Sequence, residues 1–166
     1  MLGLRKEHTP VTDRRHKVLI VDDERTIADT LDLIFSASGY ETRAAYSAEQ
    51  ALEILAEWLP DLAIIDVVLP LMNGIDLAIL LTAKYPACRP LLFSGQALTA
   101  ELLAEAAANG HKFDILAKPV HPTELLERTL TLLVANQSKQ AKEVGASEAL
   151  CIPEVDPPPD PTGHNS

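Results

Sequence analysis

The feature that most constrains the fold is the regular alternation of short apolar runs with longer amphipathic segments. Five runs with strand character recur between residues 18 and 116: Val18–Val21, Thr42–Ala45, Leu62–Ile65, Pro90–Phe93 and Phe113–Leu116. The first, third and fourth runs are apolar without alternation, which is typical of strands covered by helices on both faces. The second run alternates and contains a charge, so we expect it at an edge of the sheet.

The segments between these runs have helical spacing. The clearest apolar stripe consists of Ile27, Leu31, Ile34 and Phe35. Ser47, with Gln50 three residues later, predicts a capping box at the start of the second helix. Thr99 is expected to cap the fourth helix, which should stop at Asn109–Gly110, and Pro122 is expected to begin the fifth.

Strict alternation of strands and helices predicts right-handed crossovers and a parallel sheet with helices on both faces, an α/β doubly wound fold. In such folds ligands bind at the carboxyl ends of the strands. We expect a flexible arm over residues 1–15, one domain over residues 16–135, and a disordered, Pro-rich tail over residues 136–166. A second folded output domain is not expected at a length of 166 residues.

Charge and cysteine content exclude several classes of function. The chain has 24 acidic and 14 basic residues and a formal charge of -10, which disfavours direct binding to nucleic acid. Its two cysteines, Cys88 and Cys151, form no C-x-x-C pair, so we expect no disulfide framework or thiolate metal site, and a cytoplasmic location. No apolar stretch is long enough to predict a membrane span or a secretory signal.

Carboxylates follow two of the predicted strands. Asp22 and Asp23 come directly after the first run and Asp66 after the third, so the fold should bring them to one edge of the sheet. Three clustered anions repel each other unless protons or a cation neutralise them, and all-oxygen ligation favours Mg²⁺. Ser94 ends the fourth run and Lys118 follows the fifth, so both should face the same pocket.

Four sequence pieces resemble the motifs of the two-component response-regulator receiver family. They are Asp22-Asp23, the segment from Asp66 to Gly74, Ser94-Gly95 and Lys118-Pro119. The resemblance extends from about Lys17 to Val134, and each piece stands at the expected strand end. It implies a flavodoxin-like five-stranded sheet of order 2-1-3-4-5, and a phosphorelay switch that works with a histidine kinase or phosphotransfer protein and an unidentified target protein.

The resemblance also implies a metal site. Asp23 and Asp66 would bind Mg²⁺ directly, Asp22 would assist through water, and the Val68 backbone carbonyl would complete the protein ligands.

For the phosphoryl group, the resemblance implies that Asp66 is the phosphoacceptor, that Lys118 pairs with the phosphoryl oxygens and that Ser94 hydrogen-bonds to one of them. Gly95 would leave space for the group, and the Lys118–Pro119 bond would be cis. The chain would assist its own phosphorylation and slow dephosphorylation without being a turnover enzyme. Partner proteins would bind the face formed by the fourth helix, fifth strand and fifth helix.

One departure from the family concerns the switch mechanism, and a second point concerns the lifetime of the phosphorylated form. Ile115 stands where the family usually has an aromatic residue, which puts coupling by an aromatic rotamer in doubt. Val68 and Gln96 flank the path of attacking water, and an apolar Val68 cannot position that water, so we expect a long-lived phosphorylated form. Asn73–Gly74 is interpreted as a turn that needs positive φ.

Each residue also has a plainer interpretation. Asp22 and Asp23 taken alone could equally cap the first helix, and Ser94 and Lys118 taken singly could be a turn hydroxyl and a surface lysine. An alternative function is a phosphorylation-independent interaction module, to which Ile115 gives weight. A phosphatase is disfavoured because Val68 occupies the position of its second acid. A nucleotide-binding protein is disfavoured because no Gly-rich loop follows the first strand.

Overall fold

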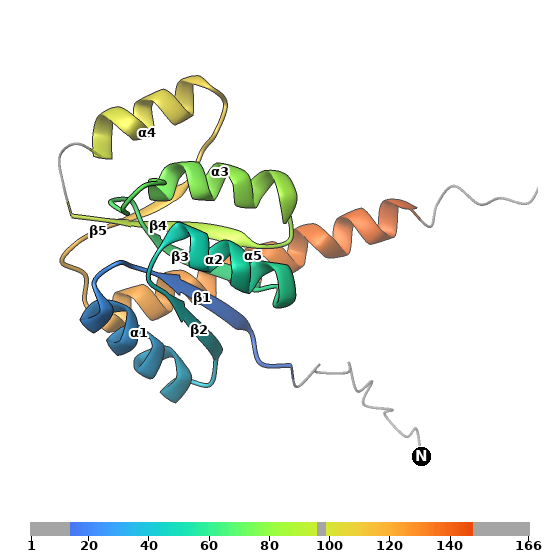
Figure 1. Ribbon diagram of the computed structural model, residues 1–166. Coiled ribbons are helices and arrows are strands. Elements are labelled where there is room, and N and C mark those ends of the chain that lie inside the picture. Colours follow the sequence, from blue (N-terminus) through green and yellow to red (C-terminus); the bar gives the residue numbers. More distant parts are fainter. Residues whose placement is uncertain (1–13, 96–98, 148–166) are drawn as a thin grey trace, which may run out of the picture.

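The chain forms a five-stranded parallel sheet with helices on both faces (Figure 1). The computed structural model describes residues 14–95 and 99–147. The strands are β1 Lys17–Val21, β2 Glu41–Ala45, β3 Leu62–Asp66, β4 Arg89–Ser94 and β5 Asp114–Ala117. Their order is β2-β1-β3-β4-β5, and every neighbouring pair is parallel. The predicted fold class is confirmed, including the edge position of the second strand.

Five helices connect the strands. They are α1 Arg25–Ala37, α2 Ala48–Glu57, α3 Gly74–Lys84, α4 Thr99–Ala108 and α5 Pro122–Ser147. Helices α1 and α5 cover one face of the sheet, and α2, α3 and α4 cover the other (Figure 1). Within the described residues, no helix combines the length and the apolarity that a membrane crossing requires.

The core consists of two apolar layers, one on each face of the sheet. Alternate residues of β1 divide between them: Leu19 and Val21 pack towards α2 and α3, and Val18 and Ile20 towards α1 and α5. All residues of β3 are buried. Strands buried on both faces can be uniformly apolar, so a charged residue at the end of β3 stands out as an exception that needs a reason.

Local signals set several helix ends as predicted. The Ser47 hydroxyl accepts a hydrogen bond from the Gln50 backbone N–H at 3.1 Å, and the Gln50 side chain accepts one from the Tyr46 N–H at 2.9 Å. Gly110 has a φ of +88° just beyond α4, a conformation that favours glycine. Helix α4 begins at Thr99, but the predicted cap by its side chain lies outside the described residues.

The interpretation of Asn73–Gly74 as a positive-φ turn was wrong. Asn73 is extended, with a φ of -70°, and its side chain caps α3 by accepting from the Asp76 N–H at 2.8 Å. Gly74 is required for space, because a Cβ there would overlap the backbone carbonyl of Asp66. The positive φ in this loop belongs to Leu71, at 65°.

The last helix is longer than predicted. We expected the tail to begin at residue 136, whereas α5 continues to Ser147. Residues 137–147 have no apolar periodicity, but most of them favour helices, and extending an existing helix is much easier than nucleating one. Near the point where we placed the boundary, the Asn136 side chain donates to the Ala87 carbonyl at 2.9 Å. The remaining tail, residues 148–166, lies outside the described residues.

Candidate functional site

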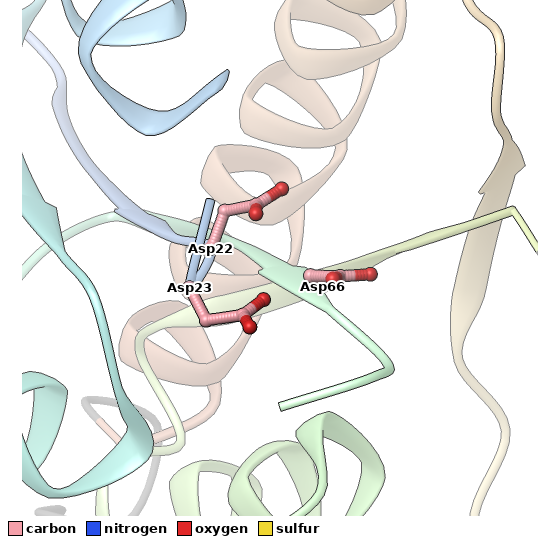
Figure 2. A group of neighbouring side chains, drawn as sticks. All are labelled: Asp22, Asp23 and Asp66. Atoms are coloured by element: carbon pink, nitrogen blue, oxygen red, sulfur yellow. The ribbon is translucent and has the colours of Figure 1, made fainter. Parts of the chain in front are cut away.

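Three carboxylates meet at the carboxyl end of the sheet. β1 and β3 are neighbours with Val21 opposite Ile65, so Asp22 and Asp66 leave adjacent strands at the same level. Figure 2 shows Asp22, Asp23 and Asp66 gathered at this edge, and one carboxylate oxygen of each lies within 4.8 Å of the other two. Asp22 and Asp66 are 2% and 8% exposed, whereas Asp23 is exposed. The predicted gathering of acidic side chains is therefore observed.

Asp22 is fixed by the backbone around it. Its N–H donates to the Ala45 carbonyl at 3.1 Å, and its carboxylate accepts from the Glu24 N–H at 2.9 Å. Glu24 is the N-cap residue of α1, and its own side chain makes no capping hydrogen bond. Asp22 therefore bonds the backbone at the start of α1, as the plain alternative expected, and it also lies in the carboxylate cluster.

Lys118 brings a positive charge to the cluster. Its Nζ lies 3.0 Å from an oxygen of Asp22 and 3.4 Å from an oxygen of Asp66. The Lys118–Pro119 peptide is cis, as predicted, and the Lys118 N–H donates to the Ser94 carbonyl at 2.6 Å. A Cβ on Gly95 would lie 3.4 Å from the Lys118 Cβ, at the close end of ordinary van der Waals contact, so Gly95 lies directly beside the lysine stem.

The surroundings of Asp66 disfavour its charged form. Burial raises the pKa of Asp66, and the negative charge of Asp22 raises it further, while Lys118 and the Val68 backbone N–H act in the opposite direction. Among the described residues, Lys118 is the one cation paired with the cluster, against three carboxylates. The all-oxygen donor set and its excess negative charge fit a hard divalent cation. The cluster could therefore hold a metal ion.

The remaining predicted site residues lie around this cluster. Ser94 is 6% exposed at the end of β4, one residue beyond Phe93, which is opposite Asp66 in the sheet. Val68 is 49% exposed, and its backbone N–H lowers the pKa of Asp66, while metal binding by its carbonyl stays a prediction. Gln96, the second residue predicted to flank the path of water, lies outside the described residues.

One contact in the site was not anticipated from the sequence. The Lys118 Nζ lies 4.6 Å from the centre of the Phe93 ring, close enough for a cation–π interaction. In the sequence Phe93 is simply the last apolar residue of a strand run. Only the pairing of β4 with β5 brings its ring beside the lysine.

A search against protein-family models matches residues 18–130 to the response regulator receiver domain. The matched region covers the whole sheet except its first residue and includes all three carboxylates, Ser94 and Lys118.

Similar curated proteins include the DNA-binding response regulator MtrA of Mycobacterium leprae, which is 30% identical over 142 residues. The alignment covers 86% of this chain and 59% of that protein. MtrA of Mycobacterium tuberculosis is 28% identical over 144 residues, covering 87% of this chain and 60% of that protein. This chain therefore spans about three fifths of the length of the curated relatives it matches.

Solved structures with the same fold include a CheY-like response regulator receiver domain protein from Methanospirillum hungatei. It has a TM-score of 0.69 and 27% identity, and the match covers 76% of this chain and 99% of that one. The signal receiver domain of an HD domain-containing protein from Pseudomonas fluorescens has a TM-score of 0.70 and 32% identity, with coverage of 75% and 99%.

Proposed function

This chain belongs to the response regulator receiver domain family of two-component systems, and we propose that it accepts a phosphoryl group on Asp66 and thereby changes its binding to a partner protein. The phosphodonor would be a phosphohistidine of a histidine kinase or phosphotransfer protein. The proposal includes Mg²⁺ as the cofactor and a cytoplasmic location.

One observation carries the proposal. Three carboxylates lie together at the carboxyl end of the sheet, and Lys118 bridges Asp22 and Asp66. Buried carboxylates that exceed their cations destabilise a fold, so the arrangement is better explained by chemistry than by stability. The site is poised to receive a cation together with a phosphoryl group whose oxygens Lys118 can bind.

In the proposed reaction an Asp66 carboxylate oxygen attacks the phosphorus of the donor in line with the bond to the leaving group. A phosphorus–oxygen bond forms, the phosphorus–nitrogen bond of the phosphohistidine breaks, and the histidine leaves with the bonding electron pair. Lys118 turns from the carboxylates to the transferring oxygens and stabilises their charge. Mg²⁺, held by Asp22, Asp23 and Asp66, would supply further charge neutralisation when bound.

The change in partner binding would follow from movement near Ser94. The Ser94 hydroxyl would turn to the new phosphoryl oxygens and draw the loop after β4 with it, which alters the surface of α4, β5 and α5. Exposed apolar side chains lie on each of these elements and could contact a partner: Leu102, Ile115 and Leu130. Ile115 is 40% exposed, so it can repack without the rotation of an aromatic ring.

A second candidate is a phosphorylation-independent interaction module of the same fold. The observation that favours it is Ile115, which departs from the aromatic residue usual at that position. In either case we propose no turnover enzyme. The DNA-binding activity in the names of the MtrA proteins belongs to chains longer than the matched region, and we propose no nucleic-acid contact for the described residues.

Incubation with Mg²⁺ and acetyl phosphate, followed by intact-mass analysis, tests the proposal. We expect a single phosphoryl adduct on the wild type, and none on Asp66→Asn or when a chelator removes Mg²⁺. Thr123→Ala, at the start of α5 and remote from the carboxylates in sequence, is a control that should leave the adduct unchanged.

The three functions give different results in this experiment. An interaction module would show no adduct under any condition, and a phosphatase would release phosphate continuously. An adduct that persists in Asp66→Asn would place the phosphoryl group on another residue and contradict the proposal.

A further inference from the structure

A cavity of about 640 Å³ opens at the amino end of the sheet, the end opposite the carboxylate cluster. It lies where α3 ends, β4 and β5 begin, and α5 passes by. Its apolar wall includes Pro86, Pro90 and Phe113, and Asn136 of α5 also lines it. The cavity takes no part in the proposed phosphoryl transfer.

The polar wall of this cavity is cationic in an otherwise acidic protein. Arg89, His111 and Lys112 line it, and Asp114 is the single carboxylate among its lining residues. Asp114 is already neutralised, because Arg128 lies 2.8 Å and Arg89 3.9 Å from its oxygens. Arg89, Lys112 and Arg128 together carry more positive charge than the one carboxylate of Asp114 balances, so positive charge is in excess around the cavity. The complementary ligand is an anionic segment with small apolar side chains.

The C-terminal segment of the chain has this composition. Residues 148–166 contain Glu148, Glu154, Asp156 and Asp160 and no lysine or arginine. Between these acids lie Ile152, Val155 and a run of three prolines, residues 157–159. Proline-rich segments bind well to apolar surfaces because little conformational entropy is lost when they are ordered.

We infer that the acidic C-terminal segment, centred on residues 152–160, docks into the cationic cavity at the amino end of the sheet.

The length of the chain allows this docking. Asn136 lines the cavity, and α5 continues to Ser147. Eleven further helical residues carry the chain about 16 Å away, at about 1.5 Å per residue. The seven residues from 148 to 154 can span about 23 Å when extended, at about 3.3 Å per residue. Glu154 can therefore return to the cavity, and Asp156 and Asp160 can follow it across the opening.

The two cysteines make a selective experiment possible. Cys88 is 2% exposed, and burial, with a smaller effect from Asp61, raises its pKa to about 12. At neutral pH a thiol-reactive nitroxide should therefore label Cys151, in the tail, and leave Cys88 unmodified. Paramagnetic broadening of amide signals in the full-length chain then reports where the tail lies.

We expect strong broadening at residues 87–89 and 110–114, and none at residues 66–69 at the opposite end of the sheet. The matched control carries the same label and the reversed tail charges Glu154→Lys, Asp156→Lys and Asp160→Lys. Tethering alone broadens both proteins equally, whereas docking should make the broadening rates of the wild type at least about fivefold larger. High salt should reduce the difference.

A charge swap tests the specific contact. Lys112 is exposed, so Lys112→Glu should fold normally, which its amide spectrum checks directly. This variant should lose most of the extra broadening, and combining it with the reversed tail should restore it. Equal broadening in the wild type and the reversed tail would overturn the inference. So would broadening found only between labelled and unlabelled chains in a mixed sample, because the occupant would then be the tail of a second copy.

Discussion

At the amino end of the sheet Asp61 and Asp114 each have their own cations, whereas at the carboxyl end three carboxylates cluster around one lysine among the described residues. Asp61 contacts Arg14 at 3.1 Å and also accepts from the Lys17 N–H at 2.9 Å. Asp114 lies between Arg128 and Arg89. The same residue type is therefore balanced at one end and in excess at the other.

The difference suggests a criterion for this fold: a carboxylate paired with its own cations is explained by stability, and a cluster of carboxylates with too few cations is not. Half-exposed pairs such as Asp114 with Arg128 contribute modestly to stability and need no other explanation. Asp22 and Asp66 are nearly buried, and they lie beside a third carboxylate. Such an arrangement adds nothing to stability, and we therefore propose that the chemistry takes place at the carboxyl end.

The largest expected effect is the loss of the lysine at the carboxyl end. Lys118→Met removes the ammonium that contacts Asp22 and Asp66, and we expect labelling by acetyl phosphate to slow by about 100-fold or more. Arg128→Met removes one of the cations of Asp114 at the amino end and should leave the labelling rate unchanged. Time courses of intact mass measure both. Equal slowing in the two variants would mean that losing either cation lowers the labelling rate by weakening the fold, and that the place of Lys118 beside the carboxylates does not matter.

Glycines at the two ends should differ in their tolerance of alanine. Gly74→Ala places a Cβ against the Asp66 carbonyl, so we expect a loss of about 3 kcal/mol in the free energy of unfolding. Gly39, after α1, has open space around it and a φ of +93°, so Gly39→Ala should cost about 1 kcal/mol. Urea unfolding compares them. A larger loss for Gly39→Ala would show that the loop around Gly74 relaxes freely.

Removing one carboxylate from each end should change stability in opposite directions. The raised pKa of Asp66 means that its charged form is disfavoured in the folded state. Stability from this residue is fully present below the pKa of the unfolded chain, and it is lost as the pH rises through the higher folded pKa. At pH 7 Asp66→Asn should therefore stabilise the fold, by up to about 1 kcal/mol after solvent screening.

Asp114→Asn is the matched change at the amino end, and it should destabilise the fold by up to about 1 kcal/mol because Arg128 and Arg89 lose their partner. Urea midpoints at pH 7 and near pH 4 provide the comparison. The advantage of Asp66→Asn should shrink at the lower pH. A destabilised Asp66→Asn at pH 7 would contradict the idea of excess charge.

The smallest expected effect concerns the lifetime of the phosphorylated state. Val68 is half-exposed beside Asp66 and offers no polar side chain to hold attacking water. Val68→Asn should speed dephosphorylation about fivefold, which corresponds to about 1 kcal/mol in the barrier. Val134→Asn, a similarly exposed valine on α5, is the control. An unchanged rate in Val68→Asn would remove the hypothesis of an intrinsically long lifetime.

The parts that sequence predicted well depend on local signals. The apolar runs of β1, β3 and β4 are long enough to identify buried strands, and Asp66 stands out because it ends the most uniformly buried one. The Ser47–Gln50 box acts within one helical turn. Because the motif residues stood at the ends of predicted strands, the sequence predicted that the three carboxylates and Lys118 would lie together.

The parts that sequence missed depend on contacts between distant segments. Gly74 is needed because α3 starts against the carbonyl of Asp66, and nothing in the local pattern of Asn73–Gly74 distinguishes this from a turn. The ring of Phe93 meets Lys118 only because β4 and β5 are adjacent. The end of α5 was predicted too early because apolar periodicity reports burial and not helix length.

The sequence by itself determined the order of strands and helices and the identity of the acidic residues, because strand length, periodicity and capping act over a few neighbouring residues. Only the tertiary structure decided which carboxylates are paired with cations. Ion pairing depends on distances of a few ångströms between segments far apart in the chain, and those distances leave Asp66 in excess at one end of the sheet and Asp114 balanced at the other.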